Sequence, residues 1–327
     1  MINSDYQLPT NEGAVPRMSH FETLPIGKEY PFESRYMKAN GHQLHYIDQG
    51  AGNPIVFLHG NPTWSYTFRN IIPYAQANNR CIAVDLIGMG RSDKPNIGYT
   101  FLEHVDYVTR FLEQLELENI TLVGHDWGAA IGLQYAMKHP DKIKAVAMLE
   151  PQALYPNPAW SDFSPPEAQS LFQTLRDPEK GWPFMRDNSV LIEGMTQTII
   201  NRPISPEEHE HYREPFRNPE ARKPMWVFPN QIPIEGRPSE VVKAVNARNT
   251  WFTYSPIPKL LFYATPGCTV REPQLNWCRK HLQHLTLCDI GKGFHHLAEE
   301  NPHLIGRELQ WWLLRVNEME KPKKRLP

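Results

Sequence analysis

The chain lacks the features that mark several broad classes of protein. None of its apolar runs approaches the ~18 residues that a membrane-spanning helix needs, so we expect no membrane partner. Neither sign of charge is in excess: 34 basic and 36 acidic residues leave a net charge of −2. Nucleic-acid-binding domains are usually strongly basic, so we expect no nucleic-acid partner. A hydrophobic content of 40%, with nine tryptophans, excludes a disordered chain.

Cysteine is also scarce. The 327 residues include four, and no two of them form a closely spaced pair. Their scatter argues against a disulfide framework and against a metal site, and it favours reduced thiols in a cytoplasmic protein. The N-terminus has no apolar stretch of the kind that a secretory signal carries, which agrees with a cytoplasmic location.

Proline, by contrast, is abundant. It accounts for 31 residues, and 15 of them fall between Pro151 and Pro238. Because proline interrupts helices, we expect short and stiff helical pieces there. We predict that residues 153–229 form a helical cap, inserted in a core made of residues 31–152 and 230–318. Residues 1–30 are expected to form an irregular arm, and the basic segment 319–327 a solvated tail.

The rest of the chain alternates between strand and helix patterns. Short apolar runs predict buried strands at 54–58, 80–85, 120–123, 144–149, 259–264 and 285–290, and residues 42–48 predict a hairpin strand after Asn40-Gly41. Helical spacing predicts helices over 101–117, 129–139, 274–281 and 302–316, and three more in the cap at 167–176, 189–199 and 206–216. This alternation predicts an α/β fold, with helices on the faces of a parallel sheet.

The strongest motif is Gly124-His125-Asp126-Trp127-Gly128, between a predicted strand and a predicted helix. A nucleophile between two glycines in such a turn is typical of the nucleophile elbow, where a strained backbone lifts the central side chain out of the sheet. The central residue here predicts a carboxylate nucleophile, Asp126. The simpler alternative is that Asp126 only caps the following helix.

An elbow of this kind is followed along the chain by an acid and then by a histidine. The loop after the last predicted strand carries His295 and His296, of which we favour His295 as the base. Glu150 ends a predicted strand and is the favoured acid. The usual alternative position, after the seventh strand, has no acid before Glu272.

Two further residues are expected to flank the nucleophile. Asn61, in the turn His59-Gly60-Asn61-Pro62, and Trp127 would each supply a backbone N–H to an oxyanion hole. Their side chains add amide and indole N–H donors, which could hold a leaving anion. The alternatives are a plain turn residue and a core tryptophan. We interpret Asp85 and Asp93 as residues that order their loop.

Six segments resemble a known family: HGNPTWSY (59–66), DLIGMGRSDKP (85–95), GHDWG (124–128), EHYREPFRNPEARKPMWVFPNQIPI (210–234), KLLFYATPG (259–267) and GKGFHHLAEENPHLIG (291–306). From about residue 35 to 316 the chain resembles the haloalkane dehalogenases, in the branch with a glutamate after strand six and an Asn–Trp halide pair. The resemblance implies an α/β-hydrolase fold: a mostly parallel eight-stranded sheet with a helical cap inserted after strand six. Lys292 and His296 depart from the family pattern without touching the predicted triad.

The resemblance also implies a reaction. Asp126 would displace halide from a primary or secondary haloalkane and form an alkyl ester, while Asn61 and Trp127 hold the halide. His295, oriented by Glu150, would then activate water to release the alcohol. The implied partners are a small halogenated hydrocarbon, water and a halide ion, with no metal and no organic cofactor, in a monomer or weak homo-oligomer. The implied pocket residues are Phe172, Leu191, Phe228, Pro229, Ile232, Cys268 and Thr269, with Phe228-Pro229 expected beside the halide.

Other activities on this framework stay open. An epoxide hydrolase shares the Asp elbow but needs cap tyrosines to protonate the opening epoxide, and Tyr155 and Tyr212 are available. Asn61 and the missing acid after strand seven argue against it. A coelenterazine-type luciferase has a similar triad, although the match over 210–234 favours a dehalogenase. A non-catalytic binding protein would have little reason to keep all five polar groups together.

Overall fold

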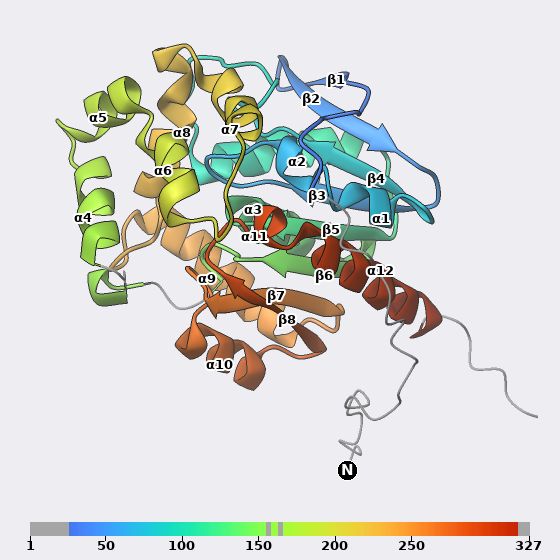
Figure 1. Cartoon of the computed structure of the whole chain (residues 1–327). Helices are drawn as coiled ribbons and strands as arrows, with labels where there is room; N and C mark the ends of the chain where they lie inside the picture. Colours follow the sequence, from blue (N-terminus) through green and yellow to red (C-terminus); the bar gives the residue numbers. More distant parts are fainter. Residues whose placement is uncertain (1–25, 155–157, 163–165, 320–327) are drawn as a thin grey trace, which may run out of the picture.

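The computed structural model describes residues 26–154, 158–162 and 166–319, and these residues contain one eight-stranded sheet (Figure 1). Its strands lie in the order β1-β2-β4-β3-β5-β6-β7-β8. β1 pairs antiparallel with β2, and β2 with β4, whereas all other neighbours are parallel. The predicted mostly parallel sheet is therefore confirmed. The strands are β1 (Arg35–Ala39), β2 (His42–Gln49), β3 (Asn53–Leu58), β4 (Asn79–Val84), β5 (Ile120–His125), β6 (Ile143–Leu149), β7 (Lys259–Pro266) and β8 (Leu285–Gly293).

Helices cover both faces of the sheet, which explains why its central strands are apolar along their whole length. In β3, Val56 and Leu58 pack into one apolar cluster, and Ile55 and Phe57 into the other. The first cluster includes α2 (Phe101–Gln114), α3 (Trp127–Lys138), α9 (Ser239–Tyr254) and α10 (Glu272–His281). The second includes α1 (Ile72–Ala75), α11 (Leu297–Glu300) and α12 (Pro302–Met319).

The connection from β6 to β7 is long and helical, as the proline-rich segment predicts. Figure 1 shows its helices α4–α8 gathered beside the sheet. Three of them, α4, α7 and α8, have a proline among their first two residues, where the missing N–H has no helical partner to lose. In chain order the elements are η3 (Trp160–Asp162), α4 (Pro166–Leu175), α5 (Gly181–Asn188), α6 (Val190–Thr198), α7 (Pro206–Arg213), η4 (Glu214–Phe216), η5 (Pro219–Arg222) and α8 (Lys223–Gln231), then α9.

Three helices of this connection, α5, α8 and α9, are absent from the sequence prediction, and α8 carries two prolines, Pro224 and Pro229. Pro183 suggested a break, but it lies in the first turn of α5, where proline is tolerated. α9 combines apolar and polar residues with weak helical periodicity, although it buries Val241, Val245 and Phe252 against the core. The predicted core and cap boundary at 229/230 falls inside α8 and stays a prediction.

The ends of the chain lie mostly outside the described residues, which include 26–30 of the predicted arm and none of 320–327. The visible part of the arm is attached to the core: the N–H of Gly27 donates to Asn70 Oδ1 over 2.8 Å, and Tyr30 shares a hydrogen bond with Ser65. In the part of the chain that the structure covers, no helix combines the length and the apolar character needed to cross a membrane.

Candidate active site

The turn between β5 and α3 has the strained geometry of a nucleophile elbow. Asp126 adopts φ +50°, and its side chain does not make the hydrogen bond of a helix N-cap, so the helix-cap alternative is wrong. A Cβ on Gly124 would lie 2.4 Å from Ala129 Cα, and one on Gly128 would lie 2.0 Å from the Leu58 carbonyl oxygen. Only glycine fits at either side of Asp126, as the motif predicts.

Two backbone N–H groups orient the Asp126 carboxylate. The N–H of Asn61 donates to Oδ2 over 2.9 Å, and the N–H of Trp127 also donates to this carboxylate. Asp126 is only 2% exposed. Burial raises the pKa of Asp126, while the nearby His295 and the two N–H donors oppose that rise.

His295 lies between two carboxylates. Its Nε2 is 3.7 Å from Asp126 Oδ1, and its Nδ1 is 3.5 Å from Glu150 Oε2. Burial disfavours the charged imidazole, but hydrogen bonds with Cys268 and Glu150 and the charge of Asp126 outweigh it and raise the pKa of His295 well above its ordinary value. His296 is fully buried, and neither ring nitrogen has a hydrogen-bond partner among the described residues. The geometry therefore favours His295 over His296.

The loop that carries His295 is held by the cap. The N–H groups of His295 and His296 both point to the carbonyl of Ile199, at 3.3 and 3.2 Å. Glu300 accepts the N–H of Phe294 at 2.8 Å and the N–H of Asn201 at 3.0 Å. Burial raises the pKa of Glu300 to about 7 against the effect of these two donors. Sequence reasoning gave Glu300 no role, because its partner in the cap lies 99 residues away.

Glu150 comes from the end of β6 but is held by the loop after β7. Its Oε2 accepts the N–H of Thr269 at 2.5 Å, the hydroxyl of Thr269 at 2.9 Å and the N–H of Cys268 at 3.2 Å. Cys268 and Thr269, predicted as pocket residues, thus lie around the predicted acid. The alternative acid, Glu272, forms an ion pair with Arg279 at 3.3 Å, with a side chain 71% exposed. Among the acids considered, Glu150 is the one beside His295.

A proline in the cap frees a carbonyl for Asn61. Pro229 lies inside α8 and has no N–H to donate to the carbonyl of Met225, four residues earlier. That carbonyl instead accepts the side-chain amide of Asn61 over 3.2 Å. One amide N–H of Asn61 therefore faces the cap, and the second stays available to a ligand.

Aromatic rings surround Trp127. Its indole stacks on Phe228, with ring centroids 5.3 Å apart, and lies 5.6 Å from Phe101. Phe228 in turn stacks on His104 at 4.5 Å. The predicted pocket residues Phe172, Leu191 and Ile232 belong to the same apolar cluster as Trp127.

Asp85 and Asp93 order their loop, as expected. Asp85 accepts the N–H groups of Ser65 and Arg91, each at 2.8 Å, and lies 2.8 Å from His45 Nδ1. Asp93 accepts the N–H of Gln43 at 2.7 Å.

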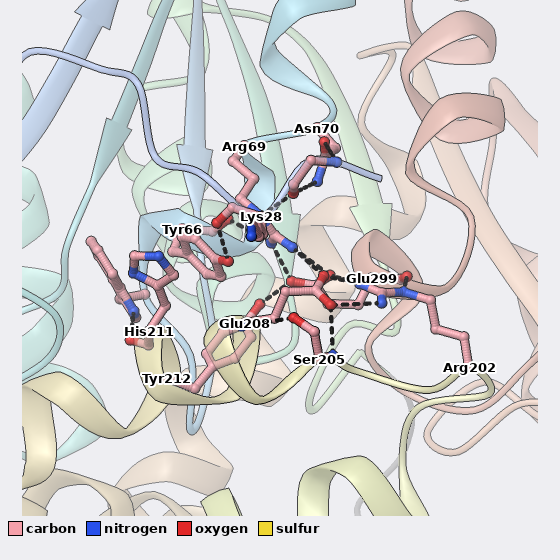
Figure 2. A network of polar contacts seen from close by, with 12 residues as sticks. Lys28, Tyr66, Arg69, Asn70, Arg202, Ser205, Glu208, His211, Tyr212 and Glu299 are labelled. Atoms are coloured by element: carbon pink, nitrogen blue, oxygen red, sulfur yellow. Dashed lines mark hydrogen bonds and ion pairs between the residues drawn. The ribbon is translucent and has the colours of Figure 1, made fainter. Parts of the chain in front are cut away.

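A buried charge cluster joins the core to the cap (Figure 2), and the N–H of its member Glu299 donates to the carbonyl of His296 over 2.8 Å. Arg69 forms ion pairs with Glu299 of α11 and with Glu208 of α7, the latter at 2.9 Å. Arg202 binds the same two carboxylates, at 2.5 and 2.7 Å. Tyr212 donates to Glu299 and is fully buried. Its hydroxyl is therefore engaged away from Asp126, while Tyr155 lies outside the described residues.

Comparison with known proteins agrees with this geometry. Residues 53–302 match the model of the α/β-hydrolase fold family. A haloalkane dehalogenase of Mesorhizobium japonicum is 36% identical over 275 residues, covering 84% of this chain and 88% of that protein. One of Agrobacterium fabrum is 37% identical, covering 85% and 90%.

The chain belongs to the haloalkane dehalogenases. The crystal structure of the haloalkane dehalogenase from Bradyrhizobium elkani superimposes with a TM-score of 0.85 at 34% identity, covering 88% of this chain and all of that one. A putative ancestral haloalkane dehalogenase superimposes with a TM-score of 0.84 at 36% identity. The resemblance noted in the sequence and the fold that it implied are both confirmed.

Proposed function

We propose that this chain hydrolyses the carbon–halogen bond of primary or secondary haloalkanes through a covalent ester on Asp126. The observation that carries the proposal is the position of Asp126. Its carboxylate is held by two backbone N–H groups and lies on one side of His295, with Glu150 on the other, in a chain that belongs to the haloalkane dehalogenases.

The first half of the reaction uses the carboxylate as nucleophile. Asp126 attacks the carbon that bears the halogen, the carbon–oxygen bond forms, and the halide leaves with the bonding electrons. The free amide N–H of Asn61 and the indole N–H of Trp127 stabilise the departing anion. Such donors act strongly here because Trp127 is buried among apolar rings.

The second half cleaves the ester. The negative charge of Asp126 helps to raise the pKa of His295. Alkylation removes this charge and so lowers the pKa of His295. The neutral imidazole then accepts a proton from water, and the hydroxide attacks the ester carbonyl. The backbone N–H groups of Asn61 and Trp127 stabilise the oxyanion, and Glu150 orients the ring. Alcohol, halide and a proton are released.

The test separates the two halves. With His295→Ala, we expect one equivalent of bromide from 1-bromobutane and a stable butyl adduct on Asp126, seen by intact-mass and peptide mass spectrometry. The matched control is His284→Asn, at an exposed position, which should turn over like the wild type. No adduct in the variant, with no halide release by the wild type, would overturn the proposal.

The alternatives have their own readouts. Turnover of styrene oxide in place of haloalkanes would indicate an epoxide hydrolase, although Tyr212 is bound to Glu299. Light emission with coelenterazine would indicate a luciferase. We also propose that the enzyme acts in the cytoplasm as a monomer or weak homo-oligomer. Its four cysteines form no disulfide in the part of the chain that the structure describes, which supports the location.

A further inference from the structure

One cysteine differs from the other three in its surroundings. Cys81 and Cys278 are buried and Cys288 is partly covered, whereas Cys268 is exposed. Cys268 lies in the loop after β7, and its sulfur lies within 4.8 Å of a ring nitrogen of His295. An exposed cysteine therefore lies beside the predicted general base.

This thiol completes a group of three metal-binding atoms. The Cys268 sulfur, a His295 ring nitrogen and a Glu150 carboxylate oxygen all lie within 4.8 Å of one another. Ligands at 2.0–2.3 Å from a tetrahedral zinc ion are spaced about 3.3–3.8 Å apart, so a contraction of about 1 Å would close the group around an ion. Glu150 Oε2 already accepts four donors from residues 268–270, but Oε1 accepts only the long 3.3 Å bond from Val270 and keeps lone pairs to offer.

We propose that Glu150, Cys268 and His295 bind a thiophilic divalent cation, with Zn²⁺ as its representative, and that the bound ion inhibits the enzyme. Thiolate, imidazole and carboxylate are the ligand types that zinc prefers, and water takes the fourth position. Binding breaks the S–H bond of Cys268 and the Nδ1–H bond of the protonated His295 ring, forms Zn–S and Zn–N bonds and releases two protons to solvent, with no change of oxidation state.

The expected inhibition is selective, and this step rests on the proposed function. The nitrogen of His295 that faces Glu150 is Nδ1. With a metal on Nδ1, the remaining ring proton sits on Nε2, which faces Asp126 and can no longer accept a proton from water. Asp126 is not a ligand, so alkylation continues while ester hydrolysis stops. Zinc should convert steady turnover into a single burst of about one halide per enzyme.

The first experiment measures binding without using activity. ZnSO₄ is titrated into the metal-free full-length enzyme by calorimetry, in a buffer without chelators, and bound zinc is counted after desalting. We expect one zinc per wild-type chain. Because loss of a supporting residue around a metal costs about 10–100-fold in affinity, loss of the ligand itself in Cys268→Ala should weaken binding at least ~10-fold. Cys288→Ala is the matched control and should bind like the wild type.

The second experiment measures bromide release from 1-bromobutane with and without ZnSO₄, each variant being compared with its own metal-free rate. We expect inhibition of the wild type and Cys288→Ala, reversal by EDTA, resistance of Cys268→Ala, and a butyl adduct on Asp126 in the zinc-inhibited enzyme. Equal zinc affinity in Cys268→Ala and the wild type would overturn the site, and bound zinc without inhibition would overturn its effect. Absence of halide release without zinc would refute the proposed function instead, while the calorimetric titration would still decide the site.

Discussion

Replacing Arg69 with methionine tests how strongly the buried charge cluster ties the cap to the core. The Arg69 side chain is 1% exposed, and it pairs with Glu299, which is 0% exposed, and with Glu208, which is 6% exposed. Removing one partner of a buried ion pair costs about 3–5 kcal/mol, because the other charge stays buried without it. Arg202 still pairs with both carboxylates, so we expect a loss near the lower limit, about 3 kcal/mol.

The assay is equilibrium unfolding in urea, supported by the melting temperature. A shift of about 2 °C per kcal/mol for a chain of this size gives a decrease of about 6 °C. The matched control is Arg217→Met. Arg217 pairs with Glu210 at the surface, where the two side chains are 69% and 46% exposed. Its replacement should change the free energy of unfolding by less than ~0.5 kcal/mol. A loss below ~1 kcal/mol for Arg69→Met would refute the reasoning. So would additivity within ~0.5 kcal/mol between Arg69→Met and Glu299→Gln, because paired residues should couple.

Three other changes have defined outcomes. In Pro229→Ala, the new N–H competes with Asn61 for the Met225 carbonyl, so chloride affinity measured by Trp fluorescence should change; a change in melting temperature alone would contradict the assignment. In Glu300→Gln, an amide group replaces one carboxylate oxygen that faces the N–H groups of Phe294 and Asn201. Rapid-quench kinetics should then show slower ester hydrolysis with unchanged alkylation, whereas the exposed control Glu240→Gln should leave both steps unchanged. Burial opposes the charged form of Asp85, but His45 and other donors lower its pKa to about 2. The ionised Asp85 carboxylate therefore adds about 2 kcal/mol to the free energy of unfolding above pH ~4, and this contribution is lost as the pH falls towards 2. Urea unfolding should show the difference in stability between the wild type and Asp85→Asn shrinking over that pH range.

Features set by short segments could be predicted from the sequence. The elbow at Asp126 depends on glycines two residues away on each side, and the central strands carry continuous apolar runs. The bounds of the central strands agree with the structure to within a few residues, whereas α5, α8 and α9 escape prediction because proline and mixed polarity conceal their periodicity.

Contacts between distant segments could not be predicted. The loop that holds Glu150 follows it by 118 residues, and the partner of Arg69 in α11 lies 230 residues further along the chain. Neither spacing nor residue type indicates that Cys268 meets His295, because the meeting depends on how two loops leave neighbouring strands β7 and β8. The spacing of the cysteines along the chain argues against a metal site. It carries no information about Glu150, Cys268 and His295, which come together only in the folded protein.

The cap contacts the side chain of Asn61 through a main-chain carbonyl oxygen, so this contact constrains the sequence of the cap only weakly. Most helical carbonyls are occupied by the helix itself, but Pro229 leaves that of Met225 open to an outside donor. The identity of the side chain at position 225 does not matter for this contact, whereas the imino acid at position 229 does. The side chains that line the cap, and with them the shape of the substrate that it admits, can therefore change while the hydrogen bond to the predicted halide-binding amide is kept.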